Sequence, residues 1–326
     1  MIIITGGAGM IGSMIAWHLN QMLGRDDIVI VDRIQHQDQW QNLVHRRYSQ
    51  YLDKDELLPW LENAKGIDAI IHMGAISATT ERDFNKLVAD NIRYSQLLWD
   101  WCAKHGVSYL YASSAATYGD GAQGYSDEES LTDTYRPLNG YGYSKQFFDQ
   151  WVLRQVKEGK PVPPQWCGFK FFNVYGPNEY HKGRMASVAF HSFNQFQELG
   201  TVKLFKSHRP DYEDGMQLRD FVYVKDAAAV VAHFLQNVQF SGIYNVGTGK
   251  ARAFKDLALA VMNSLGKTPD ITYVDMPEDL QGKYQYFTEA TMAKVRATGY
   301  NQPFHTLEEG VRDYVQNYLS QPDPFA

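Results

Sequence analysis

The sequence has few cysteines, no long apolar run and no excess of basic residues. Cys102 and Cys167 are its only cysteines, and their wide separation resembles neither a metal-ligand spacing nor a disulfide framework. We therefore expect no metal site, two buried thiols, and residence in a reducing compartment, the cytoplasm. No run of about 18 apolar residues is present, so the sequence predicts no membrane-spanning helix.

The balance of residue types is that of an ordinary globular protein. Hydrophobic residues make up 44% and charged residues 21% of the 326 positions, which suits one large or two modest domains. The net charge of −6 argues against nucleic acid as the main partner, because phosphate backbones bind to basic surfaces. The first apolar run starts at Ile2 and leads straight into a glycine-rich turn, so we expect no removable signal peptide.

The N-terminal stretch has the pattern of a dinucleotide-binding unit. The β-branched run Ile2–Thr5 precedes a loop, Gly6–Gly12, with glycines at its first, fourth and seventh positions. An amphipathic helix to about Met22 follows, and then a strand, Ile28–Asp32, that ends in an acid. Glycines let the backbone approach a pyrophosphate, and the helix N-terminus stabilises its charge. A ligand-free strand–helix turn is the alternative, disfavoured because strand, loop, helix and acid coincide.

Strands and helices continue to alternate up to about residue 172. Such alternation predicts a parallel, doubly wound, Rossmann-like α/β sheet, in which ligands bind at the carboxyl ends of the strands. His72 ends one of these strands, and we interpret it as a packed, hydrogen-bonded residue rather than a ligand. The expected strands are 47–51, 68–75, 108–114 and 166–172, and the expected helices are 57–63, 83–105 and 143–156.

The pattern changes after residue 172, where mixed elements replace the regular alternation. We therefore predict a dinucleotide-binding domain, 1–172, with returning strands around 219–246, and a smaller mixed α/β substrate-binding domain, 173–326. The polar loop 207–217 has no predicted role. The expected elements are helices at 186–197 and 226–236, strands at 202–205, 219–224, 242–247 and 271–274, and mostly helix in the remainder.

Tyr141 and Lys145 are four residues apart, so on a helix both project from one face. A nearby cation favours the phenolate, which makes the pair a plausible proton shuttle for an alcohol being oxidised. With 21 tyrosines, roughly one such spacing is expected by chance, so its context matters. Ser114 lies at a strand end, where its hydroxyl can bind a substrate oxygen or simply cap the strand.

These features together resemble the extended short-chain dehydrogenase/reductase family, which includes nucleotide-sugar epimerases and dehydratases. The matching residues follow the family's order over nearly the whole chain, and a coincidence of so many motifs is not a serious alternative. They are 5–12, Asp32, 72–75, Asn91, Ser114, Tyr141 with Lys145, 173–177 and 219–226.

The resemblance implies a bound nicotinamide dinucleotide, NADP, with NAD as the alternative. Asp32 favours the free 2′-hydroxyl of NAD, whereas Arg33 can accommodate the 2′-phosphate of NADP. Gln39 stands where a lysine often helps to hold that phosphate. The implied cofactor-binding residues are Gly6, Gly9, Met10, Ile11, Gly12, Asp32, Arg33, Lys54, Met73, Gly74, Ala75, Ile76, Ser77, Asn91, Tyr141, Lys145, Val174 and Lys182.

Three runs of residues, 111–119, 181–191 and 282–288, resemble the branch of the family that acts on ADP-heptose. The resemblance implies that the C6″ hydroxyl is oxidised to a transient ketone and that the hydride returns to the opposite face. Two acid/base groups are then needed, one for each orientation. The implied catalytic residues are Tyr141 with Lys145 for one orientation, Lys182 for the other, and Ser114 as a hydrogen-bond partner of the reacting oxygen.

Several residues are implied to hold the substrate, and some have plainer interpretations. Lys182 can be a loop lysine or a phosphate contact, and Arg219 can form a surface pair with Asp220. Arg184 stands where a small polar residue is expected, which leaves its sugar contact open. The implied substrate-binding residues are Ser114, Asn173, Arg184, His191, Phe205, Arg219 and Tyr284.

Competing functions differ in residues near the Tyr–Lys pair. A UDP-hexose 4-epimerase would share every dinucleotide-binding residue, whereas a dehydratase is expected to carry an acid pair where Ala115 and Ala116 stand. A non-catalytic dinucleotide-binding subunit would typically lack Tyr141 and Lys145. The resemblance also implies a homo-oligomer, a pentamer, with a nucleotide sugar as the small-molecule partner.

Overall fold

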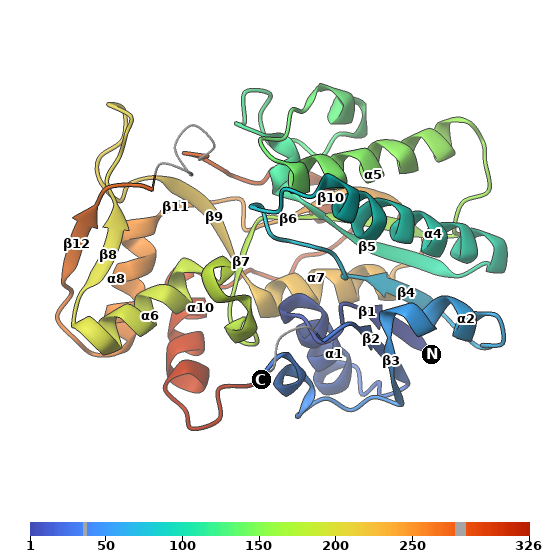
Figure 1. Cartoon of the computed structure of the whole chain (residues 1–326), viewed down its shortest axis with the longest axis horizontal. Coiled ribbons are helices and arrows are strands. Elements are labelled where there is room, and N and C mark those ends of the chain that lie inside the picture. Colours follow the sequence, from blue (N-terminus) through green and yellow to red (C-terminus); the bar gives the residue numbers. More distant parts are fainter. Residues whose placement is uncertain (35–37, 278–284) are drawn as a thin grey trace.

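The computed structural model describes residues 1–34, 38–277 and 285–326 and has a large parallel sheet covered by helices on both faces (Figure 1). The predicted Rossmann-like fold is confirmed. All six strand pairings of this sheet are parallel. In spatial order its strands are β10 (Gly242–Val246), β6 (Trp166–Phe171), β5 (Ser108–Ser114), β4 (Ala69–His72), β1 (Ile2–Thr5), β2 (Ile28–Asp32) and β3 (Gln50–Asp53).

Alternate residues of the central strands face two separate cores, as the pleat of a strand requires. Ile2 and Ile4 join the core formed with helices α1 (Met10–Met22) and α7 (Val224–Gln236). Ile3 joins the core on the other face, with α4 (Tyr94–His105) and α5 (Gly140–Lys157). Because both faces are buried, β1 is a run of three isoleucines that ends in a buried threonine, with no polar alternation.

A smaller region to one side of the large sheet carries two short sheets (Figure 1). In one sheet, β9 (Leu218–Tyr223) lies between β7 (Asn173–Tyr175) and β11 (Ala251–Ala253); in the other, β8 (Val202–Phe205) pairs with β12 (Ile271–Val274). The helices of the region are α6 (Val188–Leu199), α8 (Phe254–Ser264) and α10 (Leu307–Tyr314). Helix α9 (Ala293–Ala297) packs instead against β10 of the large sheet. The short helices α2 (Leu57–Leu61) and α3 (Phe84–Leu87) lie in the N-terminal half.

The structure differs from the sequence-based expectation in several places. The stretch after residue 247 was expected to be mostly helix, but helical elements cover less than half of its described residues. Of the strands expected to return around 219–246, only β10 joins the large sheet, because β9 pairs with β7 and β11 instead. Neither β7 nor β11 was expected as a strand. The edge strand β3 starts at Gln50 rather than near residue 47. Helix α5 starts at Gly140, before the expected residue 143, so Tyr141 lies inside its first turn.

Three expectations about single residues and the membrane are met. Cys102 and Cys167 are buried free thiols, and burial raises the pKa of each. His72 is buried, with ring nitrogens 2.6 Å from the Thr5 hydroxyl and 2.9 Å from the Ser95 hydroxyl, and burial holds its pKa well below the usual value. Within the described ranges, no helix is long and apolar enough to cross a bilayer.

Candidate active site

The glycine loop packs tightly against the end of β4 and leaves a helix end open for a phosphate. Gly6 has φ +64°, and a Cβ atom there would lie 2.5 Å from the backbone nitrogen of Gly74. A Cβ atom on Gly12 would lie 2.2 Å from the carbonyl oxygen of Gly6. No side chain caps α1 at Gly9, so the N–H groups of its first turn remain available to an anion. The loop therefore fits the pyrophosphate of a dinucleotide.

The acid at the end of β2 lies against the same loop. Asp32 is partly buried and accepts hydrogen bonds from the backbone nitrogens of Ala8 (2.9 Å) and Arg33 (2.8 Å). Burial raises the pKa of Asp32, whereas these two hydrogen bonds lower it by less. The Arg33 guanidinium donates two bonds of 2.6 Å to the carboxylate of Asp55, and Gln39 is buried, with its amide 3.4 Å from Asp32. Arg33 is thus paired with a carboxylate here.

Asn91 ties the segment after β4 to helix α5. It lies in the π-helical turn Val88–Arg93, is 1% exposed, and exchanges two hydrogen bonds with the backbone of Ile76 (2.9 and 3.0 Å). Its amide also donates to the hydroxyl of Ser144 at 2.9 Å. Asn91 therefore positions the segment Met73–Ser77, which the sequence assigned to the cofactor. Lys54, another predicted contact, pairs with Asp90.

Ser114, Tyr141 and Lys145 come together where β5 ends and α5 begins. The Ser114 hydroxyl lies close enough to Tyr141 to lower the pKa of its phenol. The ammonium of Lys145 donates to the carbonyl oxygen of Ala112 at 2.7 Å, and Lys145 is 4% exposed. Burial lowers the pKa of Lys145 to about 8. It raises the pKa of Tyr141, and the neighbouring Ser114 side chain opposes that rise. The Ser114 hydroxyl also accepts from the nitrogen of Ala116 at 3.1 Å, so it caps the turn as well.

Lys182 approaches the glycine loop from the other half of the chain. It lies in the 3₁₀ segment Tyr180–Met185, and its ammonium is 3.4 Å from the sulfur of Met10, the first residue of α1. Burial lowers the pKa of Lys182, and Glu179 opposes that effect. A partly buried lysine beside the dinucleotide loop is better suited to proton transfer than a solvated one.

Apart from Ser114, the predicted substrate-binding residues that the structure describes lie on several elements of the smaller region. Arg219 in β9 is 5% exposed and donates to the carbonyl oxygens of Leu218 and Gln285. The alternative interpretation, a surface pair with Asp220, does not hold, because both side chains are buried. Asp220 accepts hydrogen bonds from the backbone nitrogens of residues 248, 249 and 290. Asn173 and Val174 lie in β7, His191 in α6 and Phe205 at the end of β8, while Arg184 is exposed and Tyr284 falls outside the described residues.

Sequence reasoning missed a buried ion pair next to this site. Asp149 and Lys170 are 0% and 1% exposed, and their charged atoms are 2.8 Å apart. Asp149 follows Lys145 by four residues on α5, so helical spacing alone would have placed it on the same face. Lys170 comes from β6, and only the fold brings it there.

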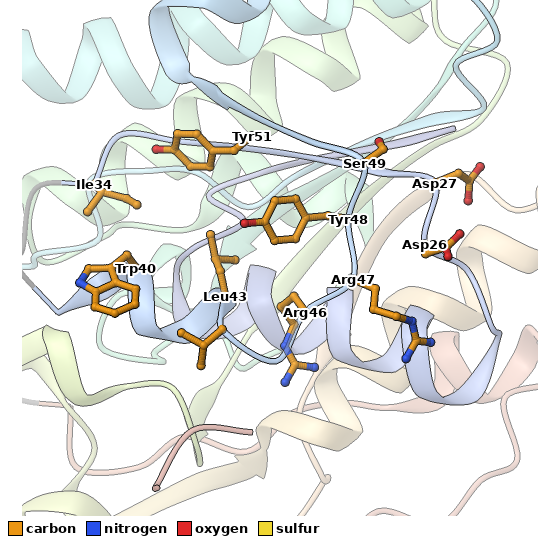
Figure 2. Close-up of a pocket in the computed structure, with 11 residues that line it drawn as sticks. Asp26, Asp27, Ile34, Trp40, Leu43, Arg46, Arg47, Tyr48, Ser49 and Tyr51 are labelled. Atoms are coloured by element: carbon orange, nitrogen blue, oxygen red, sulfur yellow. The ribbon is translucent and has the colours of Figure 1, made fainter.

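A cavity of about 1060 Å³ lies elsewhere, at the β3 edge of the large sheet (Figure 2). Figure 2 shows the aromatic side chains of Trp40, Tyr48 and Tyr51 around it. No predicted site residue lines this cavity, so its size does not locate the chemistry. Its lining residues are Asp26, Asp27, Ile34, Trp40, Leu43, Val44, Arg46, Arg47, Tyr48, Ser49 and Tyr51.

Comparison with known proteins places this geometry in a family. A relative from Fusobacterium nucleatum, named ADP-L-glycero-D-manno-heptose-6-epimerase, is 54% identical over the full length of both chains. A relative of the same name from Nitratidesulfovibrio vulgaris is 49% identical, also over the full length of both. The solved structure of the Helicobacter pylori protein of that name has a TM-score of 0.81 at 26% identity, covering 97% of this chain and 95% of that one.

The family model described as the NAD dependent epimerase/dehydratase family matches residues 2–247. That span contains the glycine loop, Asp32, Ser114, the Tyr141–Lys145 pair and Lys182. The chain belongs to the NAD-dependent epimerase/dehydratase family.

Proposed function

We propose that this chain inverts the C6″ centre of ADP-D-glycero-β-D-manno-heptose by transient oxidation and reduction with a tightly bound NADP, giving ADP-L-glycero-β-D-manno-heptose. The reaction class rests on one observation above all, the meeting of Ser114, Tyr141 and the buried Lys145 where β5 ends and α5 begins. The choice of substrate is supported by full-length similarity to relatives that bear this name.

Side chains of this protein would remove and return the protons of this reaction. The dinucleotide, when bound, supplies the acceptor that takes up the hydride and gives it back. Tyr141 would remove the hydroxyl proton in one orientation of the sugar, with Ser114 hydrogen-bonded to the reacting oxygen. The Lys145 cation stabilises the phenolate, because an opposite charge favours the ionised form. Lys182 would exchange the proton in the other orientation, since burial lowers its pKa and eases the loss of its proton.

The proposed cofactor form is NADP, with NAD as the alternative. Asp32 already accepts two backbone bonds, from Ala8 and Arg33. Arg33 would have to leave Asp55 to reach a 2′-phosphate. Mass spectrometry of the dinucleotide released from the denatured protein decides between the two forms.

The wider organisation is proposed in the same way. Residues 1–172 would bind the dinucleotide and residues 173–326 the nucleotide sugar. The chain would assemble as a homo-oligomer, a pentamer, and act in the cytoplasm in the synthesis of lipopolysaccharide inner-core heptose. Size-exclusion chromatography with light scattering tests the assembly.

The proposed reaction is tested by incubating the purified protein with the ADP-heptose and, in parallel, with UDP-glucose, without added cofactor. Proton NMR follows inversion at each sugar carbon. Inversion at C6″ alone is expected. Inversion at C4″ of UDP-glucose would instead support a UDP-hexose 4-epimerase, and no reaction with either would favour another sugar or a non-catalytic subunit.

A further inference from the structure

A buried network lies directly behind the Tyr141–Lys145 pair on α5. Asp149 is one turn beyond Lys145 and two turns beyond Tyr141, and its carboxylate is fully buried. It accepts hydrogen bonds from the hydroxyls of Tyr111 (3.1 Å) and Ser113 (2.7 Å) and from the ammonium of Lys170 (2.8 Å). Burying two charges costs free energy even when the carboxylate accepts this many hydrogen bonds. Removing one partner of such a pair is strongly destabilising, because it leaves the other charge buried and unpaired.

The network also holds the strand end that carries Ser114. The ammonium of Lys170 donates to the hydroxyl of Thr117 at 2.7 Å, and that hydroxyl donates to the carbonyl oxygen of Ser114 at 2.8 Å. Lys145 holds the carbonyl of Ala112, two residues earlier. The end of β5 is therefore fixed by charged groups from α5 and β6.

The charged and titratable groups around Asp149 come from each neighbouring element. Lys145 and Tyr141 share its helix, Tyr111 faces it from β5 and Lys170 from β6. The ammonium of Lys170 lies 5.1 Å from the ring of Tyr118 and 6.0 Å from that of Tyr135. The charge of Lys145 also acts on His72, the last residue of β4, and helps to lower its pKa. The negative charge of Asp149 raises the pKa of both Lys145 and Tyr141.

We propose that Asp149 and Lys170 are positioning residues that set the protonation of the Tyr141–Lys145 pair. Asp149 keeps Lys145 charged in its buried site, and Lys170 offsets enough of that negative charge for Tyr141 to ionise. The same two residues hold Ser114 at the end of β5. This inference rests on the proposed function for its relevance to turnover, but the charge effect itself needs no substrate.

A purely structural role for the pair makes a different prediction from this one. If the pair only stabilises the fold, removing either charge lowers the melting temperature and leaves the titration of Tyr141 where it was. If the pair sets protonation, loss of the two charges moves that titration in opposite directions. Removal of a negative charge makes proton loss easier, and removal of a positive charge makes it harder.

The experiment compares Asp149→Asn and Lys170→Met, each in the wild-type chain and in a Tyr141→Phe background. The difference in phenolate ultraviolet absorbance between the two backgrounds isolates the titration of Tyr141. We expect the midpoint to fall by about one pH unit in Asp149→Asn. In Lys170→Met it should rise by a smaller amount, because Asp149 is the charge that acts directly on Tyr141. Unchanged midpoints with lower melting temperatures would overturn the proposal. Asp313→Asn, which breaks the distant Lys225–Asp313 pair, is the matched control and should leave the midpoint unchanged.

If either single variant fails to fold, the double variant Asp149→Asn/Lys170→Met takes its place. It removes both charges of the pair and so leaves neither buried without its partner. The proposal then expects a smaller fall in the midpoint, because Asp149 is the charge that acts on Tyr141 and Lys145. An unchanged midpoint in the double variant would overturn it. Since the titration is read without substrate, failure of the wild-type chain to convert ADP-heptose would count against the proposed function and not against this one.

Discussion

The ammonium of Lys145 donates a 2.7 Å hydrogen bond to the carbonyl oxygen of Ala112 while its side chain is almost fully buried. Burial in this position lowers the pKa of Lys145 from 10.5 to about 8. The lysine therefore remains mostly charged near neutral pH, but at a cost to the folded state.

We expect Lys145→Met to lower turnover by about 10²-fold or more and to stabilise the fold at pH 7. Because the folded pKa lies below the unfolded one, the folded state binds fewer protons between pH 8 and 10.5, and stability rises with pH there. Below that range the full penalty applies. Removing the buried charge should raise the free energy of unfolding by about 1–3 kcal/mol, after the loss of the hydrogen bond to Ala112 is subtracted. Thermal unfolding at pH 7 checks this, and a variant less stable than wild type would contradict it.

Tyr141→Phe should nearly abolish turnover, by about 10²-fold or more, and leave dinucleotide binding intact, because only the phenolic proton acceptor is lost. Tyr143→Phe is the matched control, since Tyr143 lies in the same helix with its side chain 36% exposed. Initial rates and the bound dinucleotide are measured for both variants. Unchanged turnover in Tyr141→Phe would remove it from the mechanism.

Lys182→Met should lower kcat by about 10²-fold or more with little change in KM, since the second proton acceptor is lost. Lys206→Met provides the comparison, because Lys206 is exposed and pairs with Asp275. Steady-state kinetics separates the two interpretations of Lys182. A raised KM with normal kcat would make it a phosphate contact.

Asn91→Ala should lower the free energy of unfolding by about 2 kcal/mol, because the backbone groups of Ile76 lose their buried partner. We also expect less bound dinucleotide, since the segment Met73–Ser77 loses its anchor. Asn85→Ala, at an exposed position, should change neither quantity. Denaturant unfolding and dinucleotide content test both effects, and equal behaviour of the two variants would contradict the account.

Asp55→Ala should raise the share of NADP over NAD in the purified protein. The substitution releases the guanidinium of Arg33 from its two 2.6 Å bonds, so it becomes free to bind a 2′-phosphate. Mass spectrometry of the released dinucleotide measures the ratio. A lower NADP share would show that Arg33 does not act on the 2′-phosphate.

Local sequence patterns predicted the large sheet and its glycine loop well. The start of α5 was missed because glycine is a poor helix former, yet Gly142 is required by packing. A Cβ atom on Gly142 would lie 2.8 Å from the carbonyl oxygen of Ala116. The pairing of β9 with β7 and β11 was also missed, because strand partners are set by distant segments.

The candidate site likewise contains residues that local sequence patterns predicted and residues that only the fold brings together. The Tyr141–Lys145 spacing is local and could be read from the sequence. The contact of Lys182 with Met10 joins residues 172 positions apart, and only the resemblance pointed to Lys182 at all. Asp149 was within reach of helical spacing, but its partner Lys170 comes from another strand.

The most direct test of the oxidation–reduction account is to convert the ADP-heptose in deuterated water, without added cofactor, and to examine C6″ of the product by NMR. If the hydrogen leaves as a hydride and returns within the site, the inverted carbon keeps its original protium. Deuterium at C6″ would show that a proton exchanges with solvent, and would contradict the account.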